Sequence, residues 1–256
     1  MQKFSIYTSA LRNTPMEERI ALIKEVGFDS ICVEYMKNED GIYTCEEQVR
    51  LAEKYNLPIE NVHLSGSRMS SVWSDCEEGE FVTERLITQL KEMASYGIKT
   101  GIAHVTWGHE IPPAPTPLAL HRYERAVEVA EQLGVKLALE NSVFGAPLHF
   151  LLENIQSPNL GFCYDSGHEY SFSPEEDFLS KYGDRLIAMH LHDTQPGDDM
   201  HDLPFTQGID WDKTIKALKK TEYFKEMITL EVSIQNHGNL EGLQVAYDIL
   251  KKMAAM

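Results

Sequence analysis

Short apolar runs of β character alternate with longer amphipathic runs along the whole chain of 256 residues, and this alternation restricts the fold more than any other feature. In the longer runs, apolar residues recur at three- and four-residue spacing, which is typical of helices that cover a sheet. Several of these runs end at a glycine, as at Gly27, Gly97 and Gly134, where helices commonly terminate. Eight strands are predicted: FSIYTS (4–9), SICVEYM (30–36), IENVHLS (59–65), TGIAHVTW (100–107), KLALEN (136–141), LGFCYDS (160–166), RLIAMHLHD (185–193) and MITLEVS (227–233).

Eight strand-and-helix units of about 32 residues each fill the chain, which favours a closed barrel over an open sheet. No linker or low-complexity segment separates the units, and the proline-rich run at 111–117 is expected to be a stiff loop. The sequence therefore predicts an α/β protein with one domain over residues 1–256, a (β/α)8 TIM barrel. In such barrels the active site lies at the carboxyl ends of the strands.

The formal net charge of −17 argues against a nucleic-acid partner, because binding phosphates needs a basic face. The one short basic cluster, KALKK at 216–220, is expected to be the solvated face of a helix. No apolar run reaches membrane-spanning length, and the first residues do not resemble a signal peptide, so a cytoplasmic protein without a membrane partner is expected. The four cysteines form no CxxC pair and are expected to be reduced.

Side chains of a barrel strand alternate between the barrel interior and the surrounding helices. In each predicted strand from the second to the eighth, large apolar residues share one phase and a polar residue occupies the other, near the carboxyl end. Trp107 falls on the outward phase and is expected to pack, whereas Tyr7 of the first strand has inward parity. The inward polar residues that are expected to converge on one mouth are Glu34, His63, His104, Glu140, Asp165, His190 and Glu231.

Several carboxylates in one partly dehydrated funnel repel one another and take up protons unless a cation is present. The predicted strands carry no inward Lys or Arg, so a divalent metal ion is the simplest counter-charge, with His190 as a nitrogen ligand. Mn²⁺, Zn²⁺, Mg²⁺ and Co²⁺ all suit such a mixed oxygen and nitrogen set. No organic cofactor is expected. The predicted metal ligands are Glu140, Asp165, His190 and Glu231.

The segments LALEN, YDSGH, MHLHD and ITLEVS resemble motifs of the xylose isomerase-like TIM barrels, the superfamily of sugar phosphate isomerases and epimerases and of AP endonuclease family 2. The resemblance covers the whole chain. For the ketose 3-epimerases and inosose isomerases of this group, it implies the same four metal ligands. It also implies that Glu140 and Glu231 act as the acid/base pair and that His168 contacts a substrate oxygen.

The resemblance predicts a metal-dependent isomerase or epimerase that moves a proton through a metal-stabilised enediolate of a sugar, a sugar phosphate or a polyol ketone. Its partner would be a small carbohydrate, and the chain could form a homo-oligomer. The epimerases carry an Arg and a Glu where this chain has Pro196 and Ala146, so their substrate contacts do not carry over. The candidates for substrate binding are His168, Glu34, His63, His104 and Arg68.

Two alternatives remain open from the sequence. Endonuclease IV of the same superfamily binds three zinc ions and cuts abasic DNA, and all of its ligand positions can be matched in this chain. Three features weigh against DNA cleavage: the charge of −17, a chain length that leaves little room for loops that wrap DNA, and the LPFTQG at 203–208 in place of a GEG motif. A barrel that binds a sugar or a metal without turnover is the second alternative. The possible further metal ligands are His63, His104, His168, Asp199 and His201.

Overall fold

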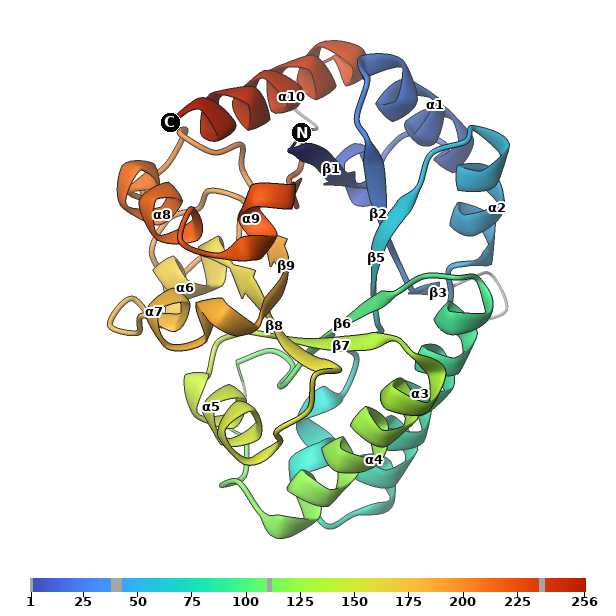
Figure 1. Ribbon diagram of the computed structural model, residues 1–256, viewed down its shortest axis with the longest axis vertical. Helices are drawn as coiled ribbons and strands as arrows, with labels where there is room; N and C mark the ends of the chain where they lie inside the picture. The colour runs from blue at the N-terminus through green and yellow to red at the C-terminus, as the bar shows by residue number, and fades with distance from the viewer. Residues whose placement is uncertain (1, 38–42, 110–111, 235–237) are drawn as a thin grey trace.

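A computed structural model describes residues 2–37, 43–109, 112–234 and 238–256, and its main feature is a barrel of eight parallel strands (Figure 1). The sheet has the order β10-β1-β2-β5-β6-β7-β8-β9, and Leu191 and Leu230 form a parallel bridge between its two outer strands. The barrel is therefore nearly closed, and the predicted TIM-barrel fold is confirmed. The strands are β1 (Lys3–Tyr7), β2 (Ser30–Glu34), β5 (Ile59–His63), β6 (Thr100–His104), β7 (Lys136–Glu140), β8 (Leu160–Asp165), β9 (Leu186–His190) and β10 (Met227–Leu230).

Helices surround the sheet, as Figure 1 shows. Gly27 (φ 102°) and Gly134 (φ 64°) end helices in the left-handed conformation that glycine adopts without strain. The helices are α1 (Met16–Val26), α2 (Glu46–Lys54), α3 (Glu77–Ser95), α4 (Pro117–Leu133), α5 (Gly145–Asn154), α6 (Ser166–Phe172), α7 (Phe178–Tyr182), α8 (Trp211–Leu218), α9 (Glu222–Glu226) and α10 (Asn239–Ala255). Shorter elements are the 3-10 helices η1 (Thr8–Leu11), η2 (Met69–Trp73) and η3 (Gly183–Arg185) and the hairpin of β3 (Met36–Lys37) and β4 (Tyr43–Thr44).

Two apolar clusters occupy the two sides of the sheet. Outward residues such as Leu137, Leu139 and Ile228 are fully buried in the large cluster that includes the helices. The opposite strand phase forms a small cluster of Ile102, Ala138, Cys163 and Ala188. The strand parity inferred from the sequence is therefore the observed one, and the acidic and histidine residues of the inward phase lie further along the strands.

Every predicted strand extends past the observed carboxyl end, because the chain leaves the ladder as soon as it reaches the mouth. After β1 the 3-10 helix η1 begins at Thr8, and after β8 the helix α6 begins at Ser166. The Asp165 carboxylate caps α6 by accepting from His168 N at 2.7 Å. The expectation that Trp107 packs among the helices is wrong, since it lies beyond the end of β6 and its side chain is 50% exposed.

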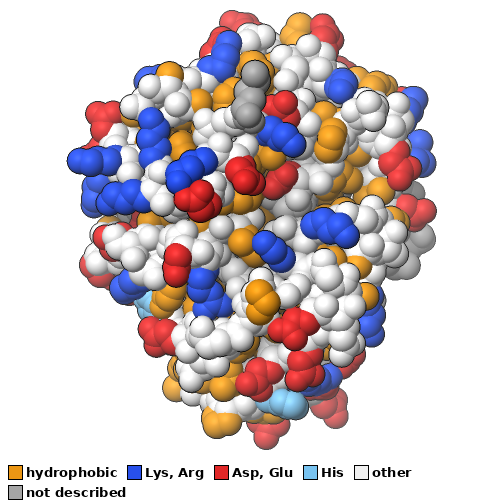
Figure 2. Space-filling model, in the orientation of Figure 1, with side chains coloured by type: hydrophobic (Ala, Val, Ile, Leu, Met, Phe, Trp, Pro, Cys, Tyr) orange, Lys and Arg blue, Asp and Glu red, His pale blue; other side chains and the backbone are white. Residues whose placement is uncertain are grey.

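Acidic and basic side chains are mixed on the face drawn in Figure 2, with Lys and Arg gathered over α8, α9 and the end of α10. Lys216, Lys219 and Lys220 are exposed, as expected for the KALKK run. In the described part of the chain, no helix combines the length and the apolar character that crossing a membrane requires.

Candidate metal centre and substrate cavity

The four predicted metal ligands meet at the carboxyl ends of adjacent strands. Glu140 ends β7, Asp165 ends β8, His190 ends β9 and Glu231 follows β10. The His190 Nδ1 atom lies 3.0 Å from Glu140 Oε1 and 3.0 Å from Glu231 Oε2. It lies 3.8 Å from Asp165 Oδ2. One ligand atom from each of the four residues falls within 4.8 Å of the others, so the structure brings all four predicted ligands together.

The donor atoms fit a divalent cation. Glu140 Oε2 and Asp165 Oδ2 are buried and accept no hydrogen bond from any residue that the structure describes. A buried carboxylate oxygen without a partner is costly, and a coordinated cation removes that cost. The mixture of three carboxylates and one imidazole is suited to divalent metals. The cluster is therefore consistent with a divalent metal site.

Tyr7 holds the His190 ring from below. Its hydroxyl donates to Asn61 Oδ1 at 2.9 Å, so its oxygen accepts from His190 Nε2, which lies 2.8 Å away. The Nδ1 atom is thus left for the carboxylate cluster, the arrangement in which an imidazole coordinates a metal. Both rings are fully buried, and burial raises the pKa of Tyr7 well above its usual value, which keeps the hydroxyl protonated.

Gly167 in the YDSGH motif makes room for His192. A Cβ atom at Gly167 would lie 2.0 Å from His192 Cε1. The His192 ring stacks on His201 with centroids 4.1 Å apart, and its Nε2 lies 3.1 Å from Asp165 Oδ1. Since Oδ1 is engaged by this ring, Oδ2 is the carboxylate oxygen that faces His190. His192 therefore positions a predicted ligand.

A second group of donors adjoins the first at Glu140. His63 Nε2 lies 3.3 Å and His104 Nε2 3.2 Å from Glu140 Oε2, without hydrogen-bond alignment. His63 Nδ1 donates to the Leu64 carbonyl at 2.8 Å, which leaves its Nε2 directed at the carboxylate. Burial would lower the pKa of His63, but the neighbouring Glu140 carboxylate outweighs this effect, and the pKa rises to about 9. The three donor atoms could hold a cation.

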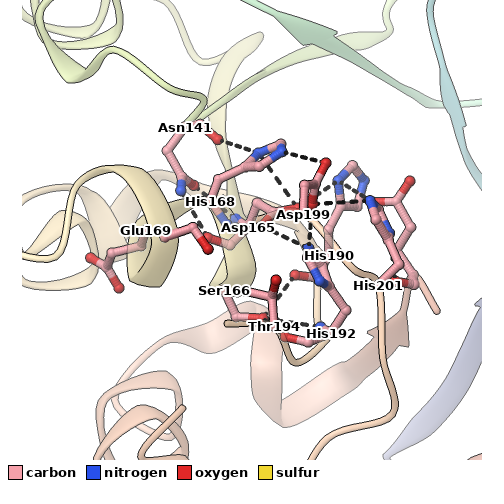
Figure 3. A network of polar contacts seen from close by, with 12 residues as sticks. Asn141, Asp165, Ser166, His168, Glu169, His190, His192, Thr194, Asp199 and His201 are labelled. Carbon is pink, nitrogen blue, oxygen red and sulfur yellow. Dashed lines mark hydrogen bonds and ion pairs between the residues drawn. The ribbon is translucent and has the colours of Figure 1, made fainter. Parts of the chain in front are cut away.

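A third group lies on the other side, where the loop after β9 meets α6 (Figure 3). Asp199 Oδ1 is 3.3 Å from His201 Nε2, and Asp199 Oδ2 is 3.5 Å from His168 Nε2. His168 Nδ1 donates to the Asn141 carbonyl at 2.9 Å, and His201 Nδ1 donates to the Glu231 carbonyl at 3.0 Å. Ligand atoms of His192, Asp199 and His201 also lie within 4.8 Å of one another. We consider His168 better disposed than His192, whose Nε2 is engaged by Asp165.

Asp193 organises the loop that carries Asp199 and His201. Its fully buried carboxylate accepts from Trp211 Nε1 at 2.9 Å. Four backbone N–H groups donate to the same carboxylate, those of residues 194, 206, 207 and 209, at 3.0–3.1 Å. This loop is therefore fixed by one carboxylate that is not itself a candidate ligand.

Each of the three groups contributes residues to the wall of a cavity of about 360 Å³, whereas Asp165 and His190 lie behind that wall. His63, His104, His168, Glu34 and Arg12 are among its lining residues, together with Glu140, Glu231, Asp199, His201 and Trp107. Arg68 is not part of this lining, and its Nη1 lies 2.9 Å from Glu78 Oε1. Arg12 lines the cavity in its place. No periodic pattern in the sequence marks Arg12, because it lies in the irregular turn after η1.

Charge in the cavity is balanced mostly by histidines. Burial would raise the pKa of Glu140, but His190 and His104 hold it well below its usual value. Burial would lower the pKa of His168, yet Asp165 and Asp199 raise it well above the ordinary value. Glu34 differs, because burial and then the charge of Glu231 raise its pKa. The histidines thus favour the ionised forms of Glu140 and Asp165, whereas Glu34 has a stronger tendency to hold a proton.

Fold and site define a TIM barrel with a buried His/Glu/Asp cluster at the carboxyl ends of its strands. The chain belongs to the xylose isomerase-like TIM barrel family, whose model matches residues 20–253. An uncharacterized protein of Sinorhizobium fredii, y4fM, is 40% identical over 105 residues, which are 40% of this chain and 33% of that protein. The matched segments span only about a third of the length of the curated relatives.

Solved structures with the same fold align over nearly the whole chain. The D-psicose 3-epimerase of Clostridium cellulolyticum H10, solved with D-tagatose, has a TM-score of 0.76 at 13% identity and covers 99% of both chains. The IolI protein with a bound zinc atom has a TM-score of 0.77 at 16% identity and covers 99% of this chain and 98% of that one. At such identities the likeness establishes the fold.

Proposed function

We propose that the protein is a divalent-metal-dependent isomerase or epimerase of a small sugar, sugar phosphate or polyol ketone. The observation that carries the proposal is that two carboxylates, Glu140 and Glu231, each lie 3.0 Å from His190 Nδ1 and line the same cavity. Two carboxylates facing one substrate carbon can remove a proton and return it at another face or atom. The epimerase names of the similar structures support this assignment.

The residues of the site have three proposed roles: they bind the cation, transfer the proton, or hold other residues and the substrate in position. Glu140, Asp165, His190 and Glu231 would hold the cation, which would supply charge stabilisation for the oxygens of an enediolate. One of the two glutamates accepts the proton of the carbon beside the carbonyl, and the other donates a proton back. Tyr7 and His192 keep His190 and Asp165 in place, while His168, His63, His104 and Glu34 present polar atoms to the substrate hydroxyls.

The test is proton exchange between substrate and solvent. The protein is loaded in turn with Mn²⁺, Zn²⁺, Mg²⁺ or Co²⁺ and incubated in D2O with ketohexoses, their phosphates and inososes, and deuterium at the carbon beside the carbonyl is followed by NMR. Glu140→Gln and Glu231→Gln are expected to abolish exchange, whereas Glu78→Gln on the surface keeps it. Metal content is measured for each variant. Exchange that persists in both cavity variants contradicts the acid/base assignment.

A second candidate is a phosphodiesterase with three metal ions that acts on abasic DNA, as in endonuclease IV. The observation that favours it is the tautomer pattern: His63, His168 and His201 each donate Nδ1–H to a backbone carbonyl and direct Nε2 toward a carboxylate. Metal-binding histidines are commonly fixed in this way. Three zinc ions per chain with nicking of abasic duplex would establish this candidate. Bound metal with neither exchange nor nicking would leave a sugar- or metal-binding barrel.

A further inference from the structure

We propose that the substrate carries an anionic oxygen group, a phosphate monoester or a carboxylate, and that Arg12 binds this group at the rim of the cavity. The proposal rests on the proposed function and narrows its substrate class. It assigns a specificity role to a residue outside the candidate metal centre.

Arg12 stands where two cavities join. It lines the 360 Å³ cavity and an adjoining one of about 180 Å³, and both are also lined by Asp199, His201 and Glu231. Among the described residues that line either cavity, Arg12 is the only Lys or Arg. Its side chain is exposed, and the charge of its guanidinium is felt by Glu34 and Arg19, although no ion pair joins it to either residue. The guanidinium is therefore available to a molecule in the cavity.

The acids around Arg12 do not need it as a partner. Asp199 lies between His168 and His201, and Glu231 Oε2 contacts His190. Glu34 is the remaining lining acid; burial raises its pKa, the charges of His63 and Arg12 lower it only in part, and no ion pair joins its carboxylate to Arg12 in the described part of the chain. A guanidinium whose neighbouring carboxylates are already balanced gains most from an additional anion, and its planar fork matches a phosphate or a carboxylate.

The backbone that carries Arg12 is held firmly. Arg19 of α1 is only 7% exposed, and its guanidinium donates to the carbonyls of Thr14 at 2.5 Å and of Thr8 at 3.4 Å, as well as to the carbonyl of Arg12 itself. The Ile234 N–H donates to the Ala10 carbonyl at 3.1 Å, which ties the same turn to the segment after β10. A fixed backbone lowers the ordering cost of binding.

Further donors lie beside Arg12. Ser9 and Ser233 line the smaller cavity, and their hydroxyls have no hydrogen-bond partner in the described part of the chain. A hydroxyl can donate to an anionic oxygen alongside the guanidinium. The anionic end of the substrate would thus lie in the smaller cavity, while its carbonyl end lies between Glu140 and Glu231 in the larger one. This division predicts a phosphorylated ketose or a keto sugar acid rather than a neutral sugar.

The experiment measures binding by calorimetry to the full chain loaded with Mn²⁺. The probes are D-fructose, D-fructose 6-phosphate and D-fructuronate, so that the neutral, phosphate and carboxylate forms share one keto sugar. We compare the wild type with Arg12→Ala, Arg12→Lys and the control Arg50→Ala, an exposed arginine of α2 outside both cavities. Metal content is determined for every variant.

At least one anionic probe is expected to bind the wild type more tightly than D-fructose does. Arg12→Ala should weaken that probe about tenfold to 100-fold and leave D-fructose unchanged, because a charged hydrogen-bond partner is lost. Arg12→Lys should lose less, and Arg50→Ala nothing. A response limited to the phosphate or to the uronate identifies the group.

Three results would overturn the inference: no preference of the wild type for either anion, equal weakening of neutral and anionic probes in Arg12→Ala, or loss of metal in that variant. The last result would mean that Arg12 only balances the acids of the metal centre. The solvent-exchange assay is independent of these measurements. Arg12-dependent binding without exchange of any probe would reject the isomerase proposal and keep the anion site.

Discussion

Replacing Gly167 by alanine tests whether the ring of His192 sets the geometry of Asp165. The new Cβ would lie 2.0 Å from His192 Cε1, 2.5 Å from Nε2 and 2.7 Å from Nδ1. The ring cannot retreat easily, because it is fully buried and stacked on His201 at an interplanar angle of 5°. The clash must therefore move the ring or the start of α6, and either shift displaces Asp165.

The expected size of the effect follows from this packing. Overpacking a buried site costs about 1–3 kcal/mol of unfolding free energy. For a chain of this length, that loss lowers the melting temperature by about 2–12 °C. Disturbing a group that orients a metal ligand typically weakens metal binding by about 10-fold to 100-fold. Both effects should appear in Gly167→Ala, measured by denaturant unfolding of the metal-free protein and by competition for Zn²⁺ with a chelator.

Two further variants separate packing from positioning. Gly238→Ala is the matched control, because its Cβ would meet nothing closer than 3.9 Å and the residue has a φ of −59°. In the double variant Gly167→Ala/His192→Ala the clash is gone, so part of the lost stability should return while metal affinity stays low. If Gly167→Ala matches Gly238→Ala in both stability and Zn²⁺ affinity, the reasoning is refuted.

Three other outcomes are expected. Tyr7→Phe leaves His190 Nε2 and Asn61 Oδ1 without their shared partner. It should cost about 1–3 kcal/mol of unfolding free energy and weaken Zn²⁺ binding about tenfold or more, as measured by unfolding and chelator competition. Unchanged Zn²⁺ affinity would contradict the role given to Tyr7. Asp193→Asn should cost about 1–3 kcal/mol and speed amide hydrogen exchange in residues 194–210, while exchange in β7 and α4 serves as the internal reference. His63 has a pKa raised from 6.5 to about 9, so its ion pair stabilises the metal-free protein fully below pH 6.5, and this contribution is lost as the pH rises through 9. Zn²⁺ needs the neutral ring, so binding should release protons at pH 7.5 and tighten toward pH 9, which calorimetry in buffers of different ionisation enthalpy measures; binding without proton release would argue against His63 as a ligand.

The barrel and its inward polar residues could be predicted because both follow from alternation along single strands. Glu140, Asp165 and His190 lie on the predicted phase at the ends of β7, β8 and β9. What lies past the strand ends could not be predicted in this way, because period-two alternation stops where the ladder stops. For this reason the outward, packed position expected for Trp107 is wrong, and no periodic pattern in the sequence marks Arg12 as a cavity residue.

The parts of the site that depend on contacts between distant segments also could not be predicted from the sequence. The need for a glycine at position 167 becomes clear only in the folded protein, where the start of α6 packs against the His192 ring that follows β9. In the sequence, Asp193 cannot be told from an ordinary loop residue, because the five donors that bind its carboxylate come together only in the folded chain. The roles of the site residues, the oligomeric state and the cytoplasmic localisation remain predictions.

Because the loop after β9 is anchored at both ends, the donor residues on this loop can change independently of the donor residues on the strands. Glu140, Asp165 and His190 are the last residues of β7, β8 and β9, so changing them alters the barrel itself. Asp199 and His201 instead lie on a surface segment that Asp193 and Trp211 clamp at its two ends. Substitutions inside this segment can remove or restore the outer donors while the barrel is left as it is. We expect that this segment can be exchanged between family members to add or remove donor residues at the mouth of the barrel.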